Sequence, residues 1–377
     1  MDSVQKLSFT RPNFHFLSGQ SFDVTIGYET YGELNAARDN AILLCHYWTG
    51  TSHAAGRYTS ADPAPGWWDA LVGPGKPIDT ARYFVICSDT LANVQAHDPN
   101  VISTGPASID PVSGQPYGSR YPVVTFRDMV HVQHALLTHL GISKLHAVGG
   151  PSGGGMQALE WAVTYPDFAT RIFGVCTFPR SSAWFTMAVY RLCRALITAD
   201  PDWHGGDYYH TPGPQTGFRQ ALALITLLAQ TPARINATAL ASPAGWELPP
   251  DPPTLSDPDG LFAHEHDMAA FITGRAATAD ANAFLAIARA ATLHDVGWRR
   301  GGFARALATV RARTLLIACE QDLFFPPMDS AAAIEAIRAG GGAAELYPFS
   351  SDFGHFGCLF DTGKFADRLG DFIAAGE

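Results

Sequence analysis

The sequence predicts an α/β fold with a mostly parallel central sheet, helices on both faces and an inserted helical lid. Short apolar runs of strand length alternate with helical patterns in both halves of the chain, which is typical of a parallel sheet covered on both faces. Residues 181–293 interrupt this alternation, because their apolar positions recur with a helical period. A glycine-rich turn at 149–155 joins a strand to a helix and carries a serine at its apex.

Composition describes a globular protein that is acidic overall. The chain has 377 residues, of which 47% are hydrophobic and 16% charged, and its formal net charge is −10. This length exceeds the usual size of one domain, so we expect one large core with an inserted subdomain. The negative charge argues against nucleic acid or an anionic membrane as a partner, because both would repel the protein.

The cysteines indicate a reducing compartment. Six are scattered along the chain without a C-x-x-C pair, and several lie in apolar runs of strand type. This distribution is typical of buried, reduced thiols. The first residues lack the apolar core of a signal peptide, and no apolar run reaches membrane-spanning length. We therefore expect a cytoplasmic protein with no membrane partner.

The first half of the chain predicts most of the sheet. The first two strands show alternating polarity, and the later ones are continuous apolar runs. An irregular stretch at 89–121 is long enough to be functional or packed by its own side chains. Thr125 fits the N-cap of a helix with Asp128 in its first turn. The expected strands are 14–17, 22–31, 41–45, 83–87, 145–148 and 171–175.

The second half predicts the lid and the end of the sheet. We expect lid helices at 184–196, 218–230, 261–272 and 282–291, with a Pro-rich segment at 241–259. The sheet pattern then resumes with strands at 314–319 and 344–349 and helices at 330–339 and 364–375. The expected domains are therefore a core of 1–178 and 296–377 and a helical lid of 179–295.

The turn after the strand 145–148 predicts a nucleophile. Gly150, Ser152 and Gly154 form a G-x-S-x-G pattern between a strand and a helix, the context in which this pattern marks a reactive serine. The glycines permit the sharp turn, because larger side chains would collide with the strand and the helix. A packing turn and a phosphate-binding loop are the alternatives, but no lysine follows as in G-x-x-x-x-G-K-[ST].

A serine hydroxyl needs a base and an orienting acid before it can attack a carbonyl group. Asp322 follows the strand 314–319, and His355 follows the strand 344–349. Both lie at carboxyl ends of strands, in the chain order serine, acid, histidine that this topology requires. We therefore predict Ser152, Asp322 and His355 as catalytic residues, with Glu320 as an alternative acid.

Two backbone amides are expected to form an oxyanion hole. One belongs to Gly153, which follows the nucleophile, and the other to the loop after the strand 41–45. That loop contains Tyr47, Trp48 and Thr49, and its donor is Trp48 or Tyr47. We take Trp48 as the candidate.

Two further clusters have simpler interpretations. The run His264-Glu265-His266-Asp267 offers metal ligands, but positions i and i+2 do not share a helix face, which favours a solvated helix start. The run Trp67-Trp68-Asp69 is more simply a packed loop than a binding surface. We predict neither a metal ion nor a bound cofactor.

Seven segments of the sequence match the pattern of a known family, and several of them are long and unusual enough to make a chance match remote. They are YETYGELN (28–35), GWWD (66–69), STGPAS (103–108), GGMQA (154–158), DPDWHGGDYY (200–209), DLFFPP (322–327) and GH (354–355). Over nearly its whole length the chain resembles the homoserine O-acetyltransferase family, whose members have the α/β-hydrolase fold.

The resemblance implies a ping-pong reaction with two small-molecule substrates. An acyl-CoA, such as acetyl-CoA, acylates Ser152 and CoA leaves. A hydroxyl acceptor then takes the acyl group with His355 as the base. The resemblance also implies a homodimer formed through the helical lid.

The acceptor pocket departs from the family pattern. The family usually has an Asp after the catalytic histidine, which holds the homoserine ammonium, whereas this chain has Phe356. A lid helix usually carries an Arg for the substrate carboxylate in the pattern G-L-x-x-A-R-M, whereas this chain has Leu222, with Arg219 three positions away. The loop pattern H-A-L-T-G has become HYWTG at 46–50, which enlarges two side chains at the pocket.

These departures shape the expected substrate. We expect Tyr47, Thr49, Leu222 and Phe356 to contact the acceptor in a pocket rebuilt with apolar groups. Homoserine buried without counter-charges would lose several kcal/mol of binding, so an uncharged or larger hydroxyl compound is the expected acceptor. The leading hypothesis is O-acyl transfer from acyl-CoA, and the alternative is hydrolysis of an ester or thioester. A catalytically inactive scaffold is disfavoured by the intact serine, acid and histidine.

Overall fold

The computed structural model describes residues 4–240 and 251–375. The Pro-rich segment predicted at 241–259 therefore lies partly outside the described residues. Its described part contains the short helix α7 (Pro253–Ser256) and turns.

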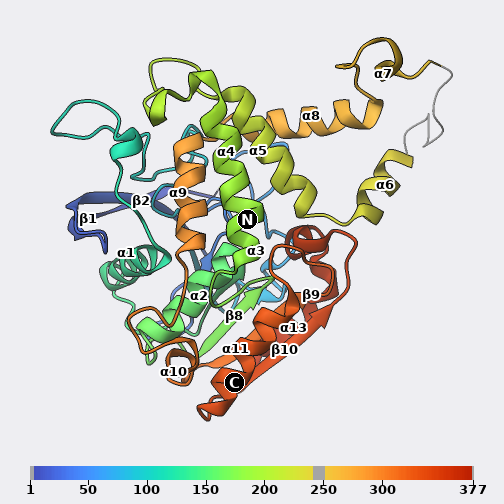
Figure 1. Ribbon diagram of the computed structural model, residues 1–377. Coiled ribbons are helices and arrows are strands. Elements are labelled where there is room, and N and C mark those ends of the chain that lie inside the picture. Colours follow the sequence, from blue (N-terminus) through green and yellow to red (C-terminus); the bar gives the residue numbers. More distant parts are fainter. Residues whose placement is uncertain (1–3, 241–250, 376–377) are drawn as a thin grey trace.

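One eight-stranded sheet forms the centre of the described residues (Figure 1). Its strands, in spatial order, are β1 (Leu7–His15), β2 (Ser21–Tyr31), β6 (Phe84–Ser88), β3 (Ala41–Cys45), β7 (Ala147–Pro151), β8 (Arg171–Val175), β9 (Arg313–Cys319) and β10 (Ala344–Phe349). The β1–β2 and β2–β6 pairs are antiparallel, and the remaining neighbours are parallel. A separate parallel pair consists of β4 (Val72–Gly73) and β5 (Ile78–Asp79). The mostly parallel sheet agrees with the prediction.

Both faces of the central strands are buried, and successive side chains of a strand point to opposite sides of the sheet. In β3, Leu43 packs into one hydrophobic cluster, and Ile42 and Leu44 pack into the other. This arrangement explains the continuous apolar runs in the sequence and confirms the predicted α/β fold. Residues of α1 (Phe126–His139), α2 (Gly153–Thr164), α10 (Phe303–Leu307) and α11 (Pro327–Ala339) belong to the first cluster, and residues of α13 (Ala366–Ala374) to the second.

The first strand differs from its prediction. Alternating polarity predicts a strand at 14–17, but β1 begins at Leu7 and ends at His15. Most of β1 is exposed at the sheet edge, and its register shifts between Arg11 and Phe14, where Asn13 has a φ of 45°. A bulge of this kind breaks the alternation from which strands are predicted.

Where the structure describes it, the segment between β8 and β9 is mainly helical, as predicted. Its two ends meet at the sheet, because the Ser181 amide donates to the His294 carbonyl (2.7 Å) and the Val296 amide to the Pro179 carbonyl (3.0 Å). Figure 1 shows α4, α5, α8 and α9 gathered on one side of the sheet. The described helices of this segment are α3 (Ala183–Phe185), a π-helical stretch (Thr186–Arg191), α4 (Leu192–Ala199), a 3₁₀ stretch (Pro201–Gly206), α5 (Gln215–Leu228), α6 (Pro232–Leu240), α7, α8 (Ala263–Ala276), α9 (Ala281–Thr292) and α10.

A buried ionic network fixes the loop that follows β3. The Glu29 carboxylate, within β2, accepts hydrogen bonds from Lys6 Nζ (3.3 Å) and the Ser52 hydroxyl (3.1 Å). Asp89 accepts from the Ser52 amide (2.8 Å) and from Lys6 Nζ (2.9 Å). Burial alone would raise the pKa of Glu29, but the hydrogen bond from His53 and the charge of Lys6 outweigh it and lower the pKa to about 2. The loop is therefore held by charged groups rather than by apolar contacts alone.

Glu29→Gln is expected to lower the free energy of unfolding at neutral pH. It should also reduce the dependence of that free energy on pH in acid. The lowered pKa of Glu29 means that its stabilising contribution is present above about pH 4.5 and is lost as the pH falls toward 2. A lowering from 4.5 to about 2 corresponds to about 3 kcal/mol of stability. Urea unfolding of both proteins between pH 7 and pH 2 measures this. Equal pH slopes for the wild type and Glu29→Gln would contradict the assignment.

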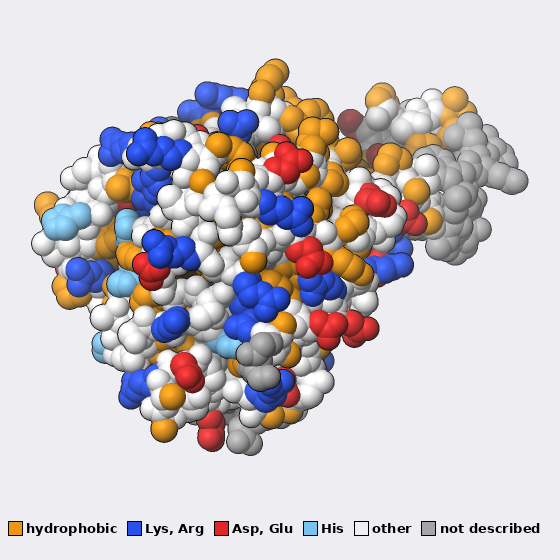
Figure 2. Space-filling model, turned by 90° about the horizontal axis from the view of Figure 1, so that it is seen from below, with side chains coloured by type: hydrophobic (Ala, Val, Ile, Leu, Met, Phe, Trp, Pro, Cys, Tyr) orange, Lys and Arg blue, Asp and Glu red, His pale blue; other side chains and the backbone are white. Residues whose placement is uncertain are grey.

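The surface carries mixed charge and several exposed apolar side chains. Figure 2 shows basic and acidic side chains interspersed on the face that it draws. Large exposed apolar side chains include Trp184, Met187 and Leu192, which follow one another from α3 into α4. Within the described residues, none of the helices has the length and apolar character needed to cross a membrane.

Candidate active site

Ser152 lies at a sharp turn between β7 and α2. Its backbone has φ 55° and ψ −121°, a conformation that costs energy for a residue other than glycine and recurs at functional sites. A Cβ atom at Gly150 or at Gly154 would collide with the carbonyl oxygen of Cys45 in β3. The two glycines therefore let α2 start directly against β3, and the steric interpretation of the G-x-S-x-G pattern is confirmed.

The structure brings Ser152, His355 and Asp322 together in one hydrogen-bonded row. His355 lies in a short 3₁₀ stretch (Gly354–Phe356) after β10, and its Nε2 is 2.9 Å from the Ser152 Oγ. Its Nδ1 is 2.7 Å from Asp322 Oδ2. All three side chains are buried, whereas Glu320, the alternative acid, is exposed. This is the connectivity that a serine nucleophile, its base and an orienting acid require.

The surroundings of His355 favour a protonatable base in a dry site. Burial alone would lower the pKa of His355, but the charge of Asp322 and its hydrogen bond raise it above the usual 6.5. Asp322 is itself fixed, because its Oδ1 accepts from the amides of Phe324 (2.7 Å) and Phe325 (2.9 Å). The rings of these two residues lie 4.9 and 4.8 Å from the imidazole and cover it.

The two predicted oxyanion-hole amides are adjacent. A Cβ atom built on Gly153 would lie 3.6 Å from the backbone nitrogen of Trp48. Within the described part of the chain, neither of these amides donates to a protein acceptor. The Trp48 ring stacks on Phe284 of α9, with centroids 4.5 Å apart, so the loop after β3 is anchored against the lid. Two free N–H groups beside Ser152 Oγ suit a developing negative oxygen.

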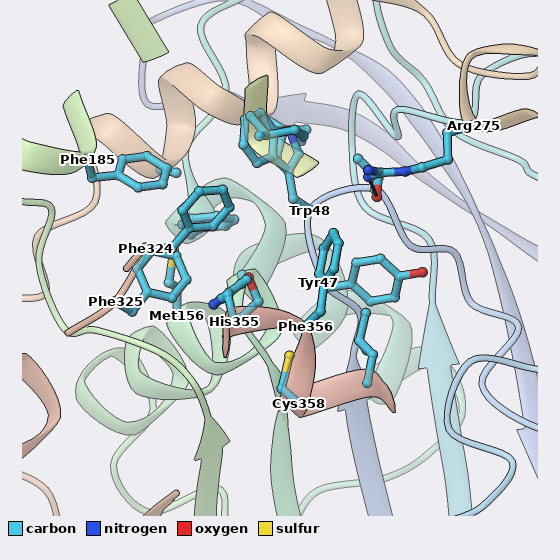
Figure 3. Close-up of a pocket in the computed structure, with 18 residues that line it drawn as sticks. Tyr47, Trp48, Met156, Phe185, Arg275, Phe324, Phe325, His355, Phe356 and Cys358 are labelled. Atoms are coloured by element: carbon cyan, nitrogen blue, oxygen red, sulfur yellow. Dashed lines mark hydrogen bonds between the residues drawn. The ribbon is translucent and has the colours of Figure 1, made fainter. Parts of the chain in front are cut away.

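A cavity of about 50 Å³ opens above Ser152 and His355 (Figure 3). Tyr47, Thr49 and Phe356, which we expect to contact the acceptor, are among the residues that line it. Leu222 does not line it, which corrects that prediction. Leu222 is fully buried in α5, and Ile225, one turn further along the same helix, faces the cavity instead.

Arg275 also lines the cavity, and the sequence analysis did not identify it. The helical period predicts a helix that ends at 272, but α8 continues to Ala276 and so carries Arg275 to the cavity. Its Nη1 donates to the Thr226 hydroxyl (2.8 Å), and its Nη2 to the Thr49 hydroxyl (3.3 Å). Burial lowers the pKa of Arg275. The pocket is therefore not wholly apolar, contrary to the expectation from sequence.

A second, larger cavity of about 1060 Å³ lies outside the first, between α5, α6 and α8. Phe356 lines both cavities, so they are neighbours at this residue. Arg219 and Arg234 line the outer cavity, and Arg219 is absent from the lining of the inner one. Arg219 therefore supplies no charge to the inner cavity.

The structure also places the two other clusters that the sequence analysis considered, residues 264–267 and 67–69. His264 to Asp267 lie at the start of α8, and the described residues contain no group of three side chains able to hold a metal ion. Trp68 is fully buried, and its indole N–H donates to the Cys358 carbonyl (2.9 Å), close to His355 in the chain. The interpretation of Trp67-Trp68-Asp69 as a packed loop is confirmed for Trp68.

Known proteins with similar sequences and structures share this framework. A family model described as the alpha/beta hydrolase fold matches residues 40–205. The homoserine O-acetyltransferase of Symbiobacterium thermophilum is 41% identical over 361 residues, covering 94% of this chain and 90% of that protein. The homoserine O-acetyltransferase of Moorella thermoacetica is 38% identical over 365 residues, covering 95% and 93%.

Two solved structures resemble this one over almost their whole length. The crystal structure of homoserine O-acetyltransferase from Bacillus anthracis has a TM-score of 0.95 and 37% identity, and the match covers 99% of this chain and 98% of that one. Esterase E22 has a TM-score of 0.93 and 40% identity, covering 98% and 100%. With its fold, its serine turn and these relatives, the chain belongs to the homoserine O-acetyltransferase family of the α/β-hydrolase fold.

Proposed function

We propose that this protein is a serine-dependent O-acyltransferase that moves an acetyl or other short acyl group from acyl-CoA to a hydroxyl acceptor. The observation that carries the proposal is the hydrogen-bonded row Ser152–His355–Asp322 at the base of a small, lined cavity. The names of the curated relatives, which are homoserine O-acetyltransferases, favour transfer as the reaction.

The residues of the row act in two half-reactions. In the first, Ser152 Oγ attacks the thioester carbonyl carbon while His355 Nε2 accepts the hydroxyl proton, and the amides of Gly153 and Trp48 donate to the carbonyl oxygen. The C–S bond breaks, and the CoA thiol leaves with the proton from His355. In the second, the acceptor hydroxyl gives its proton to His355 while its oxygen attacks the acyl carbon. The bond between the acyl carbon and Ser152 Oγ then breaks, His355 returns the proton to Oγ, and the ester product leaves.

The two cavities suit the two parts of an acyl-CoA. An inner cavity of about 50 Å³ holds only a few water-sized groups, which favours an acetyl group over a long chain. The outer cavity is far larger, and Arg219 and Arg234 line it. Guanidinium groups are well suited to bind phosphate, so the nucleotide end of CoA is assigned to this outer cavity.

We propose domain boundaries at the point where the two ends of the lid segment meet. Residues 179–295 form the lid, and 1–178 with 296–377 form the core. Backbone hydrogen bonds between Pro179 and Val296 and between Ser181 and His294 close the lid at its base.

The exposed side chains of Trp184, Met187 and Leu192 favour a homodimer through the lid. Sedimentation velocity tests this state.

The cysteines favour a cytoplasmic location. All six are free thiols in the interior. Burial raises the pKa of Cys45 and of Cys193 to about 12, so these thiols remain protonated at neutral pH. Thiols that are kept reduced are typical of the cytoplasm.

Hydrolysis is the second candidate reaction. The resemblance to esterase E22, at 40% identity, favours it, and so does the apolar Phe356 beside His355. Both reactions use the same acyl-enzyme and differ only in whether water is excluded from it. The wild-type enzyme is incubated with acetyl-CoA, with and without a panel of hydroxyl compounds. Release of CoA that requires a hydroxyl compound supports transfer, and release that does not require one supports hydrolysis.

L-Homoserine is expected to be a poor acceptor, and Phe356→Asp is expected to improve it. The described residues that line the cavity include no Asp or Glu, so an ammonium group would be buried there without a counter-charge. A charge-assisted contact is worth about 1.5–3 kcal/mol, so Phe356→Asp should raise kcat/KM for homoserine roughly ten- to a hundredfold. Phe356→Asn is the matched control, because the Asn side chain has the same shape as that of Asp but carries no charge. Efficient acetylation of homoserine by the wild type would contradict this prediction.

A further inference from the structure

Arg275 is the only Lys, Arg, Asp or Glu among the described residues that line the inner cavity. The remaining lining side chains are apolar, apart from hydroxyls, the Trp48 indole N–H, Cys358 and His355. No ion pair links Arg275 to a carboxylate within residues 4–240 and 251–375. The cavity therefore has a fixed positive charge and no negative one.

The neighbours of Arg275 orient its guanidinium without neutralising it. Hydroxyls of Thr226 and Thr49 accept one N–H each, and a guanidinium has five. The rings of Phe271 and Phe356 lie 5.7 and 5.9 Å from its central carbon, at the outer limit of a cation–π contact. Arg275 is partly buried, and a cation that is partly withdrawn from water without a counter-ion is stabilised when an anion binds beside it.

The anion must be small if it is part of a molecule that reacts at Ser152. Ser152 and Arg275 line the same cavity, which has a volume of only about 50 Å³. The phosphates of CoA do not fit this requirement, because the whole pantetheine arm separates them from the thioester. A carboxylate a few bonds from the reacting oxygen does fit it, and it matches the planar fork of an arginine.

We propose that the natural acceptor is a small hydroxycarboxylic acid without an ammonium group, whose carboxylate binds Arg275 while its hydroxyl reacts at Ser152. This inference rests on the proposed acyl transfer for the acceptor, but the same contact would select the alcohol part of an ester if water were the acceptor. Arg275 is then a specificity-determining residue. Its charge reaches the cavity from α8, whereas Leu222 in α5 has none to offer.

The test compares a carboxylate with its neutral amide in two reactions. The acceptors are 4-hydroxybutyrate and 4-hydroxybutyramide with acetyl-CoA, and the esters are 4-acetoxybutyrate and 4-acetoxybutyramide in water. For each pair the ratio of kcat/KM, charged over neutral, is measured in the wild type, Arg275→Met and Arg275→Lys. The ratio does not depend on the fraction of folded enzyme, so a partly misfolded variant still gives an answer.

The wild type is expected to favour the carboxylate about ten- to a hundredfold in at least one pair. Arg275→Met should bring that ratio close to one, and Arg275→Lys should retain part of it because the charge remains. Arg289→Met, which removes an exposed charge of α9 that lines neither cavity, is the matched control and should keep the wild-type ratio. The absence of a preference in the wild type, or an unchanged ratio in Arg275→Met, would overturn the proposal. So would a preference for L-homoserine over 4-hydroxybutyrate.

The two pairs separate this inference from the proposed function. If the esters are hydrolysed with a preference for the carboxylate but neither acceptor promotes CoA release, acyl transfer fails and the role of Arg275 stands. If the acceptors promote CoA release without any preference for the carboxylate, acyl transfer stands and the role of Arg275 fails.

Discussion

Ser152→Ala is expected to abolish acyl-enzyme formation and to lower turnover by about 10⁴- to 10⁶-fold, the range found when a serine nucleophile is removed from such a row. The hydroxyl is the group that becomes acylated, and the residual rate would come from the oxyanion amides and from substrate binding alone. Labelling with a fluorophosphonate probe, followed by intact mass measurement, detects the loss directly.

A matched serine variant guards against a general effect on the protein. Ser60 is exposed and far along the chain from the serine turn, so Ser60→Ala should be labelled like the wild type. Full labelling of Ser152→Ala would show that another residue is the nucleophile, and the assignment would fail.

Asp322→Asn is expected to lower kcat by about 10⁴-fold, as the same change does in other serine triads, and to move the acid limb of the pH profile. His355 must be neutral to accept the proton from Ser152, so activity rises as the pH passes upward through its pKa. The charge of Asp322 holds that pKa above 6.5, whereas burial acts in the opposite direction. Without the charge only the effect of burial remains, and the acid limb should shift to lower pH.

The pH profile distinguishes an electrostatic role from a loss of folding. Inactive, unfolded enzyme lowers the whole curve without moving it. Glu320→Gln alters an exposed carboxylate two residues before Asp322 and should leave both the rate and the acid limb in place. An acid limb in Asp322→Asn at the wild-type pH would argue that Asp322 does not set the charge of His355.

The sheet and the catalytic row could be predicted because their signals are local. Each central strand is an apolar run, and the turn around Ser152 is constrained sterically by its glycines. His355 and Asp322 follow strands whose carboxyl ends must meet in a parallel sheet. The edge strand β1 lacks such a signal, because its exposed residues and its bulge at Asn13 leave no alternation.

The acceptor end of the site could not be predicted in the same way. Thr49, Thr226 and Arg275 meet only through tertiary packing, and no spacing in the sequence joins them. The family pattern places a charge at the position of Leu222 in α5, whereas here a charge reaches the cavity from α8. The apolar periodicity also predicts too short a helix, since α8 continues four residues beyond the predicted end. Its final turn carries Arg275.

The buried cysteines have a practical consequence for kinetics. A chromogenic disulfide reagent reacts with thiolates that it can reach, and the native chain offers it none of its own, since all six sulfurs are enclosed and burial raises the pKa of Cys319 to about 11. The colour that develops during turnover therefore counts liberated CoA alone, continuously and without a protein blank. The same reagent measures unfolding, because each unfolded chain exposes six reactive thiols.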